Sequence, residues 1–421
     1  MSERNIVKLG ELIEINPESI KKNYPYENIE YVDISSVGSG LLHGTTIINL
    51  TDAPSRAKRL VKGKDTIIST VRPNRRSFLY IKEPSKNMVV STGFAVLRAK
   101  EKIDSRFLYY VISDKKFTNY LVSNEKGAAY PAVGVDTIAD AEISLPPLSE
   151  QQMIASILGS LDDKIELNRN INRTLENMAM ALFKHWFVDF GQFHEDEFVQ
   201  SEIGMIPKGW DVGVLGDIYN TSSGGTPSRK KEEYYKDGKI NWLKTKELKD
   251  GYIFDTEEKI TELGLMKSSA KLFPARTVII AMYGATVGQL GILANQSSTN
   301  QACCAILENN NAFPSSYAYL YLLYNREKII NLANGGAQQN INQQIIKSLP
   351  VVLPPNGLMI SMGNQLESLF QLKKNNEETN LTLENTRDYL LSRLLSGDIE
   401  ISKAVEIVKE VISNEQPEPS L

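Results

Sequence analysis

The chain has 421 residues, of which 42% are hydrophobic and 23% are charged, and its formal net charge is −4. This length predicts two or more domains, and the composition is that of a globular protein rather than a disordered one. No stretch approaches 18 uninterrupted apolar residues, and the N-terminus lacks the apolar core of a signal peptide, which argues against a membrane partner and against secretion. The two cysteines, Cys303 and Cys304, are adjacent in an apolar run, which predicts buried, reduced thiols in a cytoplasmic protein.

Residues 1–148 are expected to form a compact α+β domain. Short β-branched runs such as DTIIST (from Asp65) and GFAVLRA (from Gly93) alternate with turn residues and with a helix-like stretch over 104–122. The pattern does not give the order of the strands.

The densest cationic stretch of the chain runs from Pro54 to Lys86 and has a net charge of +8. Clustered lysines and arginines beside a strand suit contacts with DNA phosphates, and an arginine at a loop tip can also read guanine. A solvated basic loop is the alternative. The candidate DNA-binding residues of this stretch are Arg56, Lys58, Arg59, Lys62, Lys64, Arg72, Arg75 and Arg76.

A long helix is predicted from Glu150 to Phe187, after the extended Leu-Pro-Pro at Leu145. Ser149 and Gln152 have the spacing of an N-cap pair. Asp162 and Asp163 are interpreted as part of a solvated helix face. The expected apolar stripe, interrupted by Asn168, consists of Ile154, Leu158, Leu161, Ile165, Ile171, Leu175, Met178, Leu182 and Trp186.

The chain then repeats itself. Leu-Pro-Pro recurs at Leu353, 208 residues after its first occurrence, and Thr-Leu-Glu-Asn recurs in RTLENMAMALFKHW and LTLENTRDYLLSRL. Other matches keep the same order with offsets of 206 to 212, so the chain is two copies of one unit of about 200 residues. The second copy replaces LSEQQ with NGLMI and so lacks the Ser/Gln pair. Its helical stripe consists of Met362, Leu366, Leu369, Leu372, Leu383, Leu390 and Leu394, and Gly397 is its expected C-cap.

The two long stripes should pair as an antiparallel coiled coil, because neither has its own core to cover it. Two separate helices, each lying on its own domain, are the alternative. The helical segments 151–200 and 356–400 carry net charges of −4 and −3, which suits protein partners better than DNA. The candidate partner-binding residues on these helices are Leu158, Leu161, Ile165, Leu175, Leu182, Trp186, Leu366, Leu369, Leu383, Leu390 and Leu394.

The second copy carries different polar loops on the same frame. Glycines in TSSGGTPSRKK (from Thr221) would let backbone amides approach phosphate, and the amides of GGAQQNINQQ (from Gly335) match adenine edges. The candidate DNA-binding residues here are Gly224, Gly225, Thr226, Ser228, Arg229, Lys230, Lys231, Lys244, Lys246, Tyr283, Gln338, Gln339, Asn340 and Asn342.

No constellation typical of an enzyme is found. His43, His185 and His194 are scattered, no metal-ligand spacing is present, and neither a phosphate-binding GxxxxGK[ST] loop nor a GxSxG elbow occurs. The Pro-Pro pairs follow leucine, so the Asp/Asn-Pro-Pro-Tyr motif of amino-methyltransferases is absent as well. The sequence therefore predicts a binding and scaffolding protein without catalytic or metal-binding residues.

The whole chain resembles a specificity (S) subunit of a type I restriction–modification system. The resemblance is carried by LPPLSEQQMIASILGSLDDKIELNRNINRTLENMAMALFKHWF, by the linker SEIGMIPKGWDVGVLGDI, by Gly-Gly-Thr-Pro-Ser at Gly224 and by the terminal LLSRLLSGDI. It implies two related target-recognition domains, 1–148 and 201–355. They would be separated by helical spacers, 149–200 with a linker and 356–400, followed by a C-terminal tail, 401–421.

The resemblance also implies what the chain would do. Each recognition domain would read one half of a bipartite double-stranded DNA target in host defence, and the helices would set the gap. Two modification (methyltransferase) subunits would dock with S-adenosylmethionine, and restriction subunits would add ATP- and Mg-dependent translocation and cleavage. There are three alternatives: a stand-alone DNA-binding regulator, a coiled-coil protein scaffold and a stand-alone methyltransferase. The last is the least favoured, because no catalytic motif is found.

Overall fold

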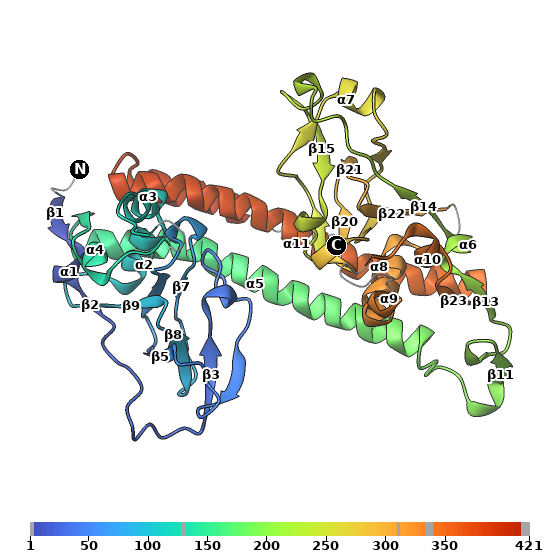
Figure 1. The fold of residues 1–421 in the computed structure, drawn as a ribbon, viewed down its shortest axis with the longest axis horizontal. Coiled ribbons are helices and arrows are strands. Elements are labelled where there is room, and N and C mark those ends of the chain that lie inside the picture. Colours follow the sequence, from blue (N-terminus) through green and yellow to red (C-terminus); the bar gives the residue numbers. More distant parts are fainter. Residues whose placement is uncertain (1–3, 128–130, 310–311, 333–339, 414–421) are drawn as a thin grey trace. The chain divides into compact units, whose positions relative to one another are not determined.

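The computed structural model describes residues 4–127, 131–309, 312–332 and 340–413. The chain divides into two compact units, the first formed by Met1–Ile165 with Leu381–Leu421 and the second by Glu166–Asn380. Each unit contains one copy of the α+β repeat together with part of each long helix (Figure 1). In the described ranges no helix combines the length and the apolar character needed to cross a membrane.

Two four-stranded sheets form the α+β part of the first unit, and we call this part of each unit, without its long helices, the recognition fold because of the expectation stated above. Their orders are β2-β9-β6-β7 and β4-β3-β8-β5, and only the β3–β8 pair is parallel. A separate antiparallel pair, β1–β10, joins the start of the copy to its end. The strands are β1 (Asn5–Lys8), β2 (Ile13–Ile15), β3 (Asn28–Val32), β4 (Thr46–Asn49), β5 (Ala57–Leu60), β6 (Thr66–Ser69), β7 (Phe78–Tyr80), β8 (Met88–Ser91), β9 (Phe94–Ala99) and β10 (Glu142–Leu145).

The second unit repeats this topology strand by strand. Its sheets have the orders β14-β22-β19-β20-β16 and β17-β15-β21-β18, with β13–β23 as the separate antiparallel pair. The additional strand is β16, which pairs in parallel with β20. A short hairpin, β11–β12, precedes the copy. The strands are β11 (Phe198–Ser201), β12 (Gly204–Pro207), β13 (Asp211–Val214), β14 (Tyr219–Ser223), β15 (Ile240–Leu243), β16 (Gly251–Ile253), β17 (Lys259–Ile260), β18 (Leu272–Phe273), β19 (Val278–Ala281), β20 (Leu290–Leu293), β21 (Ser297–Thr299), β22 (Cys303–Glu308) and β23 (Pro350–Leu353).

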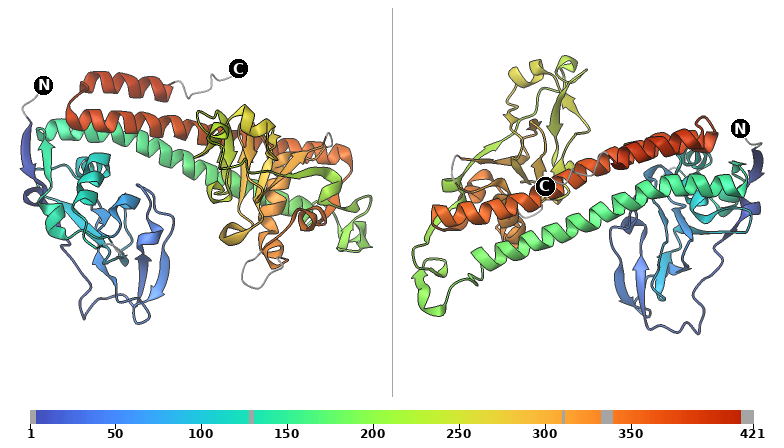
Figure 2. Two further views of the ribbon diagram at one scale, coloured as in Figure 1. Left: turned by 45° about the horizontal axis from the view of Figure 1, so that its top comes forward. Right: turned by 180° about the vertical axis from the view of Figure 1, so that it is seen from behind.

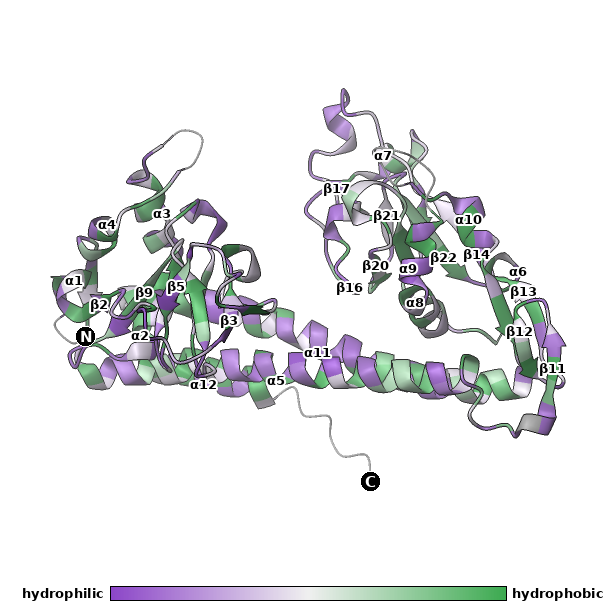
Figure 3. Cartoon of the chain, turned by 60° about the horizontal axis from the view of Figure 1, so that its bottom comes forward, coloured by the Kyte–Doolittle hydropathy of each residue, from purple (hydrophilic) through white to green (hydrophobic). Residues whose placement is uncertain are grey.

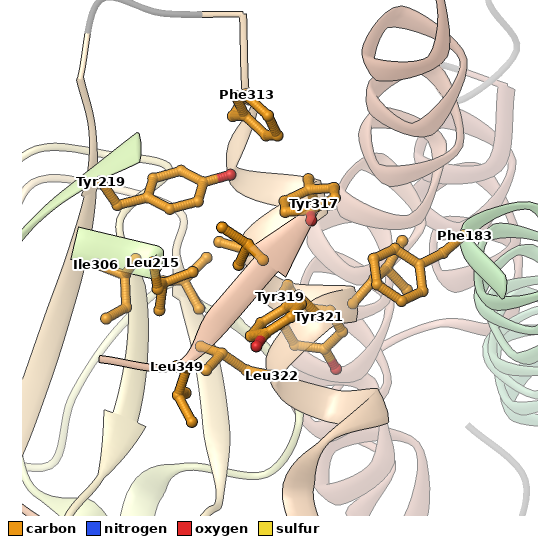
Figure 4. Close-up of a cluster of buried hydrophobic side chains, with 14 of the residues drawn as sticks. Phe183, Leu215, Tyr219, Ile306, Phe313, Tyr317, Tyr319, Tyr321, Leu322 and Leu349 are labelled. Atoms are coloured by element: carbon orange, nitrogen blue, oxygen red, sulfur yellow. The ribbon is translucent and has the colours of Figure 1, made fainter. Parts of the chain in front are cut away.

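Short helices cover the sheets in both units. In the second unit the apolar helix α8 packs its tyrosines Tyr317, Tyr319 and Tyr321 between the sheet and Phe183 of the long helix (Figure 4). Cys303 and Cys304 are both buried on β22, and burial raises the pKa of the Cys304 thiol to about 12. The short helices are α1 (Leu9–Leu12), α2 (Ser105–Ser113), α3 (Lys115–Ser123), α4 (Val135–Ala139), α6 (Leu215–Ile218), α7 (Glu262–Met266), α8 (Ser315–Tyr324), α9 (Arg326–Asn331) and α10 (Gln343–Lys347).

The two long helices are α5 (Leu148–Phe187) and α11 (Asn356–Ser396). Within each unit, segments of the two lie side by side, antiparallel, which confirms the predicted coiled coil (Figures 1 and 2). Both begin directly after the second proline of Leu-Pro-Pro, whose carbonyl accepts the first helical bonds, from Gln151 N in α5 (3.0 Å) and from Met359 N in α11 (3.0 Å). Ser149 therefore lies inside the first turn, and its prediction as the N-cap is wrong.

The seam between the long helices differs from the predicted stripe at three positions. Ile171, Met178 and Leu372 are 40%, 50% and 53% exposed, so they do not belong to the seam. Polar or small side chains are buried in their place, namely Asn172, Ala179 and Lys373. Figure 3 shows hydrophilic and hydrophobic residues alternating along the visible faces of α5 and α11. Of the other predicted positions, most are buried, and Leu175, Leu182 and Leu369 are half-buried.

The end of the described chain is helical. Gly397, with φ of 82°, follows the last residue of α11 and confirms the predicted C-cap. Residues of the expected C-terminal tail then form α12 (Ile401–Ser413), which buries Ala404 and Val408 in the core of the first unit. Arg4 caps the end of α11 by donating to the carbonyl oxygens of Leu394 (3.1 Å) and Leu395 (2.6 Å).

Candidate nucleic-acid interface

In the first unit one edge of both sheets gathers the loops that carry most of the predicted arginines. β3, β6 and β8 end at this edge, and β5, β7 and β9 begin there. The loop 70–77 between β6 and β7 crosses it and pairs with the segment 131–133. Val71 and Ala132 form a bridge, and the Arg72 amide donates to the carbonyl of Pro131 (2.7 Å). We refer to this edge as the loop edge of the first unit.

The predicted cationic stretch does not form one surface. Arg56, Arg72, Arg75 and Arg76 lie at the loop edge, whereas Lys62 and Lys64 lie in the turn before β6, at the opposite end of that strand. Lys58 is exposed on β5, and Arg59 is half-buried there, where burial lowers its pKa. Proximity in the sequence therefore overstated how many of these cations can act together.

Several of these cations are also bound to groups of the same chain. Arg56 Nη2 lies 2.8 Å from Asp33 Oδ2. Burial would raise the pKa of Asp33, but hydrogen bonds from Ser35 and Tyr31, together with the charge of Arg56, lower it. Lys62 pairs with Glu18, and this contact lowers the pKa of Glu18. The acids that partner Arg56 and Lys62 both lie outside the cationic stretch, so the local charge is smaller than the sequence count.

The loop 70–77 is held by its backbone and by one arginine. Arg72 and Arg76 have positive φ values, 50° and 55°, an unfavourable backbone geometry for residues with a Cβ. The Arg76 guanidinium turns inward and donates to the carbonyl of Ser113 (2.6 Å) and to the hydroxyl of Thr118 (3.2 Å). Arg76 therefore positions the loop, and the exposed Arg75 is the better candidate for a DNA contact.

The second unit has the equivalent loop edge. The loop after β19 forms a bridge between Tyr283 and Asn340, and the Ile341 amide donates to the carbonyl of Met282 (3.0 Å). Both Tyr283 and Asn340 are exposed. Asn342 accepts a hydrogen bond from the Ile345 amide (2.9 Å) and so caps α10. Gln338 and Gln339 lie outside the described residues.

Gly224 and Gly225 allow their loop to pack closely against neighbouring segments of the chain. A Cβ on Gly224 would lie 2.2 Å from the carbonyl oxygen of Thr299, and one on Gly225 would lie 2.4 Å from Ser269. The Gly225 amide already donates to the carbonyl of Thr299 (2.9 Å). The glycines therefore let two loops approach each other, and a contact of their amides with phosphate stays a prediction. Thr226 is exposed and hydrogen-bonds Gln301, and Ser228 is exposed as well.

Two glutamates partner the cations of the second unit. Glu258 pairs with Arg229 and with Lys244 (2.5 Å), and both hydrogen bonds lower its pKa. Glu257 pairs with Lys246 (2.5 Å). The Arg229 guanidinium also lies over two aromatic rings, 4.4 Å from the centre of Tyr235 and 4.9 Å from that of Trp242. The exposed Lys230 and Lys231 lie beside it, and Lys231 Nζ donates to Tyr234 Oη (3.0 Å).

Sequence reasoning missed three exposed lysines near the first loop edge. Lys126 pairs with Ala132, and Lys115 and Lys116 begin α3, which contacts the 3₁₀ turn of Pro73–Arg75. The repeat offered a signal for Lys126, because this residue directly precedes residues 127–134, which the 208-residue offset places opposite GGAQQNIN, already a candidate. The sequence held no comparable signal for Lys115 and Lys116, because only the fold brings α3 to the loop.

A tyrosine from the recognition fold joins the long helices in each unit. In the first unit Tyr110 Oη donates to Asp162 (2.7 Å), and Asp162 also accepts from Arg387 (2.9 Å). The neighbouring Asp163 pairs with Arg106 (2.8 Å). The interpretation as a solvated face is therefore wrong for Asp162, whose side chain is 19% exposed, whereas Asp163 is paired but still 51% exposed.

In the second unit Tyr319 Oη donates to Glu176 (2.9 Å). The buried Lys373 Nζ lies 3.6 Å from both Glu176 and Glu377. The Tyr252 amide of β16 donates to Glu377 (2.8 Å). These contacts attach the second recognition fold to α5 and to α11.

Most of the candidate partner-binding side chains are buried within their own chain. Leu158, Leu161, Leu366, Leu383 and Leu390 are fully buried, because they fill the contact between the helices and the recognition folds. Ile165, Trp186 and Leu394 are buried too, and Leu175, Leu182 and Leu369 are half-buried. A partner would meet the outer faces of α5 and α11 instead.

No group of three or more His, Cys, Asp and Glu side chains that could hold a metal occurs in the part of the chain that the structure describes.

Comparison with known proteins gives a consistent result. The family model described as "Type I restriction modification DNA specificity domain" matches residues 1–177 and again 207–384, which confirms the duplication. The HindI specificity subunit of a type I restriction enzyme from Haemophilus influenzae is 26% identical, over 89% of this chain and 95% of its own. The MjaIX specificity subunit from Methanocaldococcus jannaschii is 28% identical, over 81% of this chain and 79% of its own.

A solved structure also has this fold. The S subunit of a type I restriction–modification system from M. genitalium is 16% identical, covers 94% of this chain and 96% of its own, and superposes with a TM-score of 0.57. The family match extends over both copies of the repeat and most of the two long helices. The chain therefore belongs to the type I restriction–modification DNA specificity family.

Proposed function

We propose that this chain is the DNA-recognition subunit of a type I restriction–modification complex. Each recognition fold would read one half of a bipartite double-stranded target through its loop edge, while α5 and α11 set the spacing between the halves. The observation that carries the proposal is the duplicated frame with different polar loops at the same edge. Two copies of one frame suit two ligands of one class, and different loops suit different sequences.

The loop 70–77 of the first unit is cationic, whereas the loop 282–289 of the second unit contains no cation. Arg75 is exposed in the loop 70–77, with Lys115, Lys116 and Lys126 on neighbouring segments. Cations spaced along loops suit the phosphate backbone, and an arginine at a loop tip suits guanine in the major groove. At the second loop edge Tyr283 and Asn340 supply an aromatic ring and an amide, which suit base contacts rather than phosphate contacts.

The chemistry of modification and cleavage would come from partners. Two methyltransferase subunits would bring S-adenosylmethionine, and restriction subunits would bring ATP- and Mg-dependent cleavage, so the chain itself would be non-catalytic. The outer faces of α5 and α11 carry exposed Leu167, Ile171 and Met178, and Ile360 and Leu372, which would supply apolar docking contacts. A subunit that reads cellular DNA would work in the cytoplasm of a prokaryotic cell.

The decisive experiment maps methylated adenines in DNA from cells that express this chain with its adjacent methyltransferase, and from cells with the methyltransferase alone. The expected result is a bipartite motif with a methylated adenine in each half, present only with this chain. Methylation that is independent of the chain would overturn the proposal. Sequence-specific DNA binding without the methyltransferase would instead favour a stand-alone regulator.

A further inference from the structure

Four asparagines lie where the seam between α5 and α11 should be apolar. Asn168 donates from Nδ2 to Asn380 Oδ1 (2.9 Å), and Asn376 donates from Nδ2 to Asn172 Oδ1 (2.8 Å). Asn168, Asn172 and Asn380 are only 2%, 7% and 7% exposed. Asn172 Nδ2 also donates to the carbonyl of Lys373 (3.1 Å). All of these residues belong to the second unit, and their amides satisfy one another across the seam.

The two pairs are copies of each other. Asn168 and Asn376 are 208 residues apart, and so are Asn172 and Asn380, the same offset that separates the two Leu-Pro-Pro sequences. Asn168 and Asn172 of α5 therefore correspond in the repeat to Asn376 and Asn380 of α11. Each hydrogen-bonded pair joins one position of the first copy to the other position of the second copy. Both copies of the repeat thus carry polar residues at these seam positions.

The apolar part of the seam does not by itself define how far the helices are shifted along each other. Its side chains recur every three or four residues, so a shift by seven residues would again place apolar residues opposite apolar residues. The asparagines break this equivalence. After such a shift the amides of Asn172, Asn376 and Asn380 would face apolar side chains without a hydrogen-bond partner, which is costly in a buried position.

We propose that the two asparagine pairs fix the register of α5 against α11. If the chain reads DNA as proposed above, the same residues fix the length of the gap in its target. A shift of one heptad moves a helix by about 10 Å at ~1.5 Å per residue. That distance corresponds to roughly three base pairs at ~3.4 Å each.

The first test measures the register directly in the full-length chain. Spin labels on cysteines at the exposed positions Asn177 and Gln371 report the distance between the two helices within the second unit. The parent chain should give a single narrow distance. A variant with Asn168, Asn172, Asn376 and Asn380 all replaced by Leu should give a second population or a broader distribution at longer distances, because a shift of about 10 Å along the helix axis separates labels that start level with each other. Its thermal midpoint should be equal or higher, because four amides of the seam are replaced by apolar side chains.

Two further variants keep this test decisive. The pair Asn168→Leu with Asn380→Leu changes only one layer and serves if the fourfold variant does not fold. The control is Asn170→Leu with Asn364→Leu, because both asparagines are exposed on the same helices, and it should keep the single distance. A single unchanged distance in the folded leucine variants would overturn the proposal, and contacts such as Tyr319 to Glu176 would then set the register.

The second test separates this inference from the proposed function. In cells with the methyltransferase, the leucine variants should methylate targets with the original gap and also targets whose gap differs by about three base pairs. If the parent chain gives no chain-dependent methylation, the proposed function fails while the spin-label result still decides the register. If the parent chain methylates and the variants keep one gap, the gap is not set by the asparagines.

Discussion

The two units share one frame and differ in the residues at its loop edge. In the first unit the loop 70–77 carries three arginines and pairs with the segment 131–133. In the second unit the equivalent loop contains Tyr283 and no cation from 282 to 289, and it pairs with Asn340. Strand order and direction are otherwise the same, apart from β16. The comparison teaches that the frame positions a loop without specifying its chemistry.

A second difference lies where each frame meets the long helices. In the first unit Asp162 is the central acceptor, between Tyr110 and Arg387. In the second unit a buried cation, Lys373, lies between two glutamates. The residue 208 positions before Lys373 is Ile165, which is buried in the first unit. The same position along the repeat is therefore apolar in one copy and charged in the other.

The largest effect is expected from Gly225→Ala, which should destabilise the second unit only. The new Cβ would lie 2.4 Å from the backbone of Ser269. Forcing the loops apart should lower the free energy of unfolding by about 3 kcal/mol, measured by urea denaturation. Gly357→Ala is the matched control, because a Cβ there meets nothing within 4 Å. A stable Gly225→Ala protein with weaker DNA binding would instead support a phosphate contact.

Lys373→Met should cost about 2–3 kcal/mol, because it leaves Glu176 and Glu377 partly buried without their cation. Thermal or urea unfolding checks this value. Adding Glu377→Gln should recover much of the loss by removing one unpaired charge. Lys184→Met, at an exposed position of α5 in the same unit, should change stability by less than about 0.5 kcal/mol. If Lys373→Met and Lys184→Met changed the free energy of unfolding equally, the buried cation would not contribute to stability.

Arg75→Gln and Tyr283→Ala should affect the salt dependence of DNA binding differently, and this difference distinguishes the contacts made by the two loop edges. For the assembly with its methyltransferase, Arg75→Gln should weaken target binding about tenfold and reduce the slope of log K against log salt by about 1. Tyr283→Ala should weaken binding without changing the slope, since it removes no charge. Lys64→Gln, at the far end of β6, is the control for Arg75. An unchanged slope in Arg75→Gln would exclude a phosphate contact at this position.

The smallest effect concerns pH and is confined to the second unit. Burial raises the pKa of Glu377, although Lys373 and the Tyr252 amide oppose this. A carboxyl group whose pKa is higher in the folded state binds protons more tightly there, so its contribution to stability falls as pH rises above the ordinary value near 4.5. The free energy of unfolding of Glu377→Gln, relative to the parent, should therefore increase between pH 4 and pH 7. A constant difference over this range would contradict the assignment.

The sequence was sufficient to predict the duplication, the α+β frame and the antiparallel helices. Each of these depends on patterns repeated over many residues, such as Leu-Pro-Pro and the apolar spacing that follows it. The seam was misassigned at Ile171, Met178 and Leu372, because counting apolar residues cannot detect polar side chains that satisfy one another when buried. Asn172 and Lys373 are acceptable in the seam only because partners from the other helix or from the recognition fold reach them.

The candidate interface was predicted less well than the fold. A dense run of cations suggested one surface, but β6 separates Lys64 from Arg72, and Asp33 and Glu18 bind two of the other cations. Arg76 was grouped with Arg75, although its guanidinium turns inward toward Ser113. Such distinctions depend on which way a side chain leaves a turn, and the residue type alone does not determine this.

The loop 70–77 is joined to the segment 131–133 mainly through main-chain atoms. The Arg72 amide bonds the carbonyl of Pro131, and the Val133 amide bonds the carbonyl of Thr70 (2.9 Å). Main-chain bonds survive exchange of most side chains, so positions 74 and 75 form a natural site for a combinatorial library. Selection from such a library would yield altered targets on an unchanged scaffold, and Tyr283 and Asn340 would offer a second, independent site for diversification.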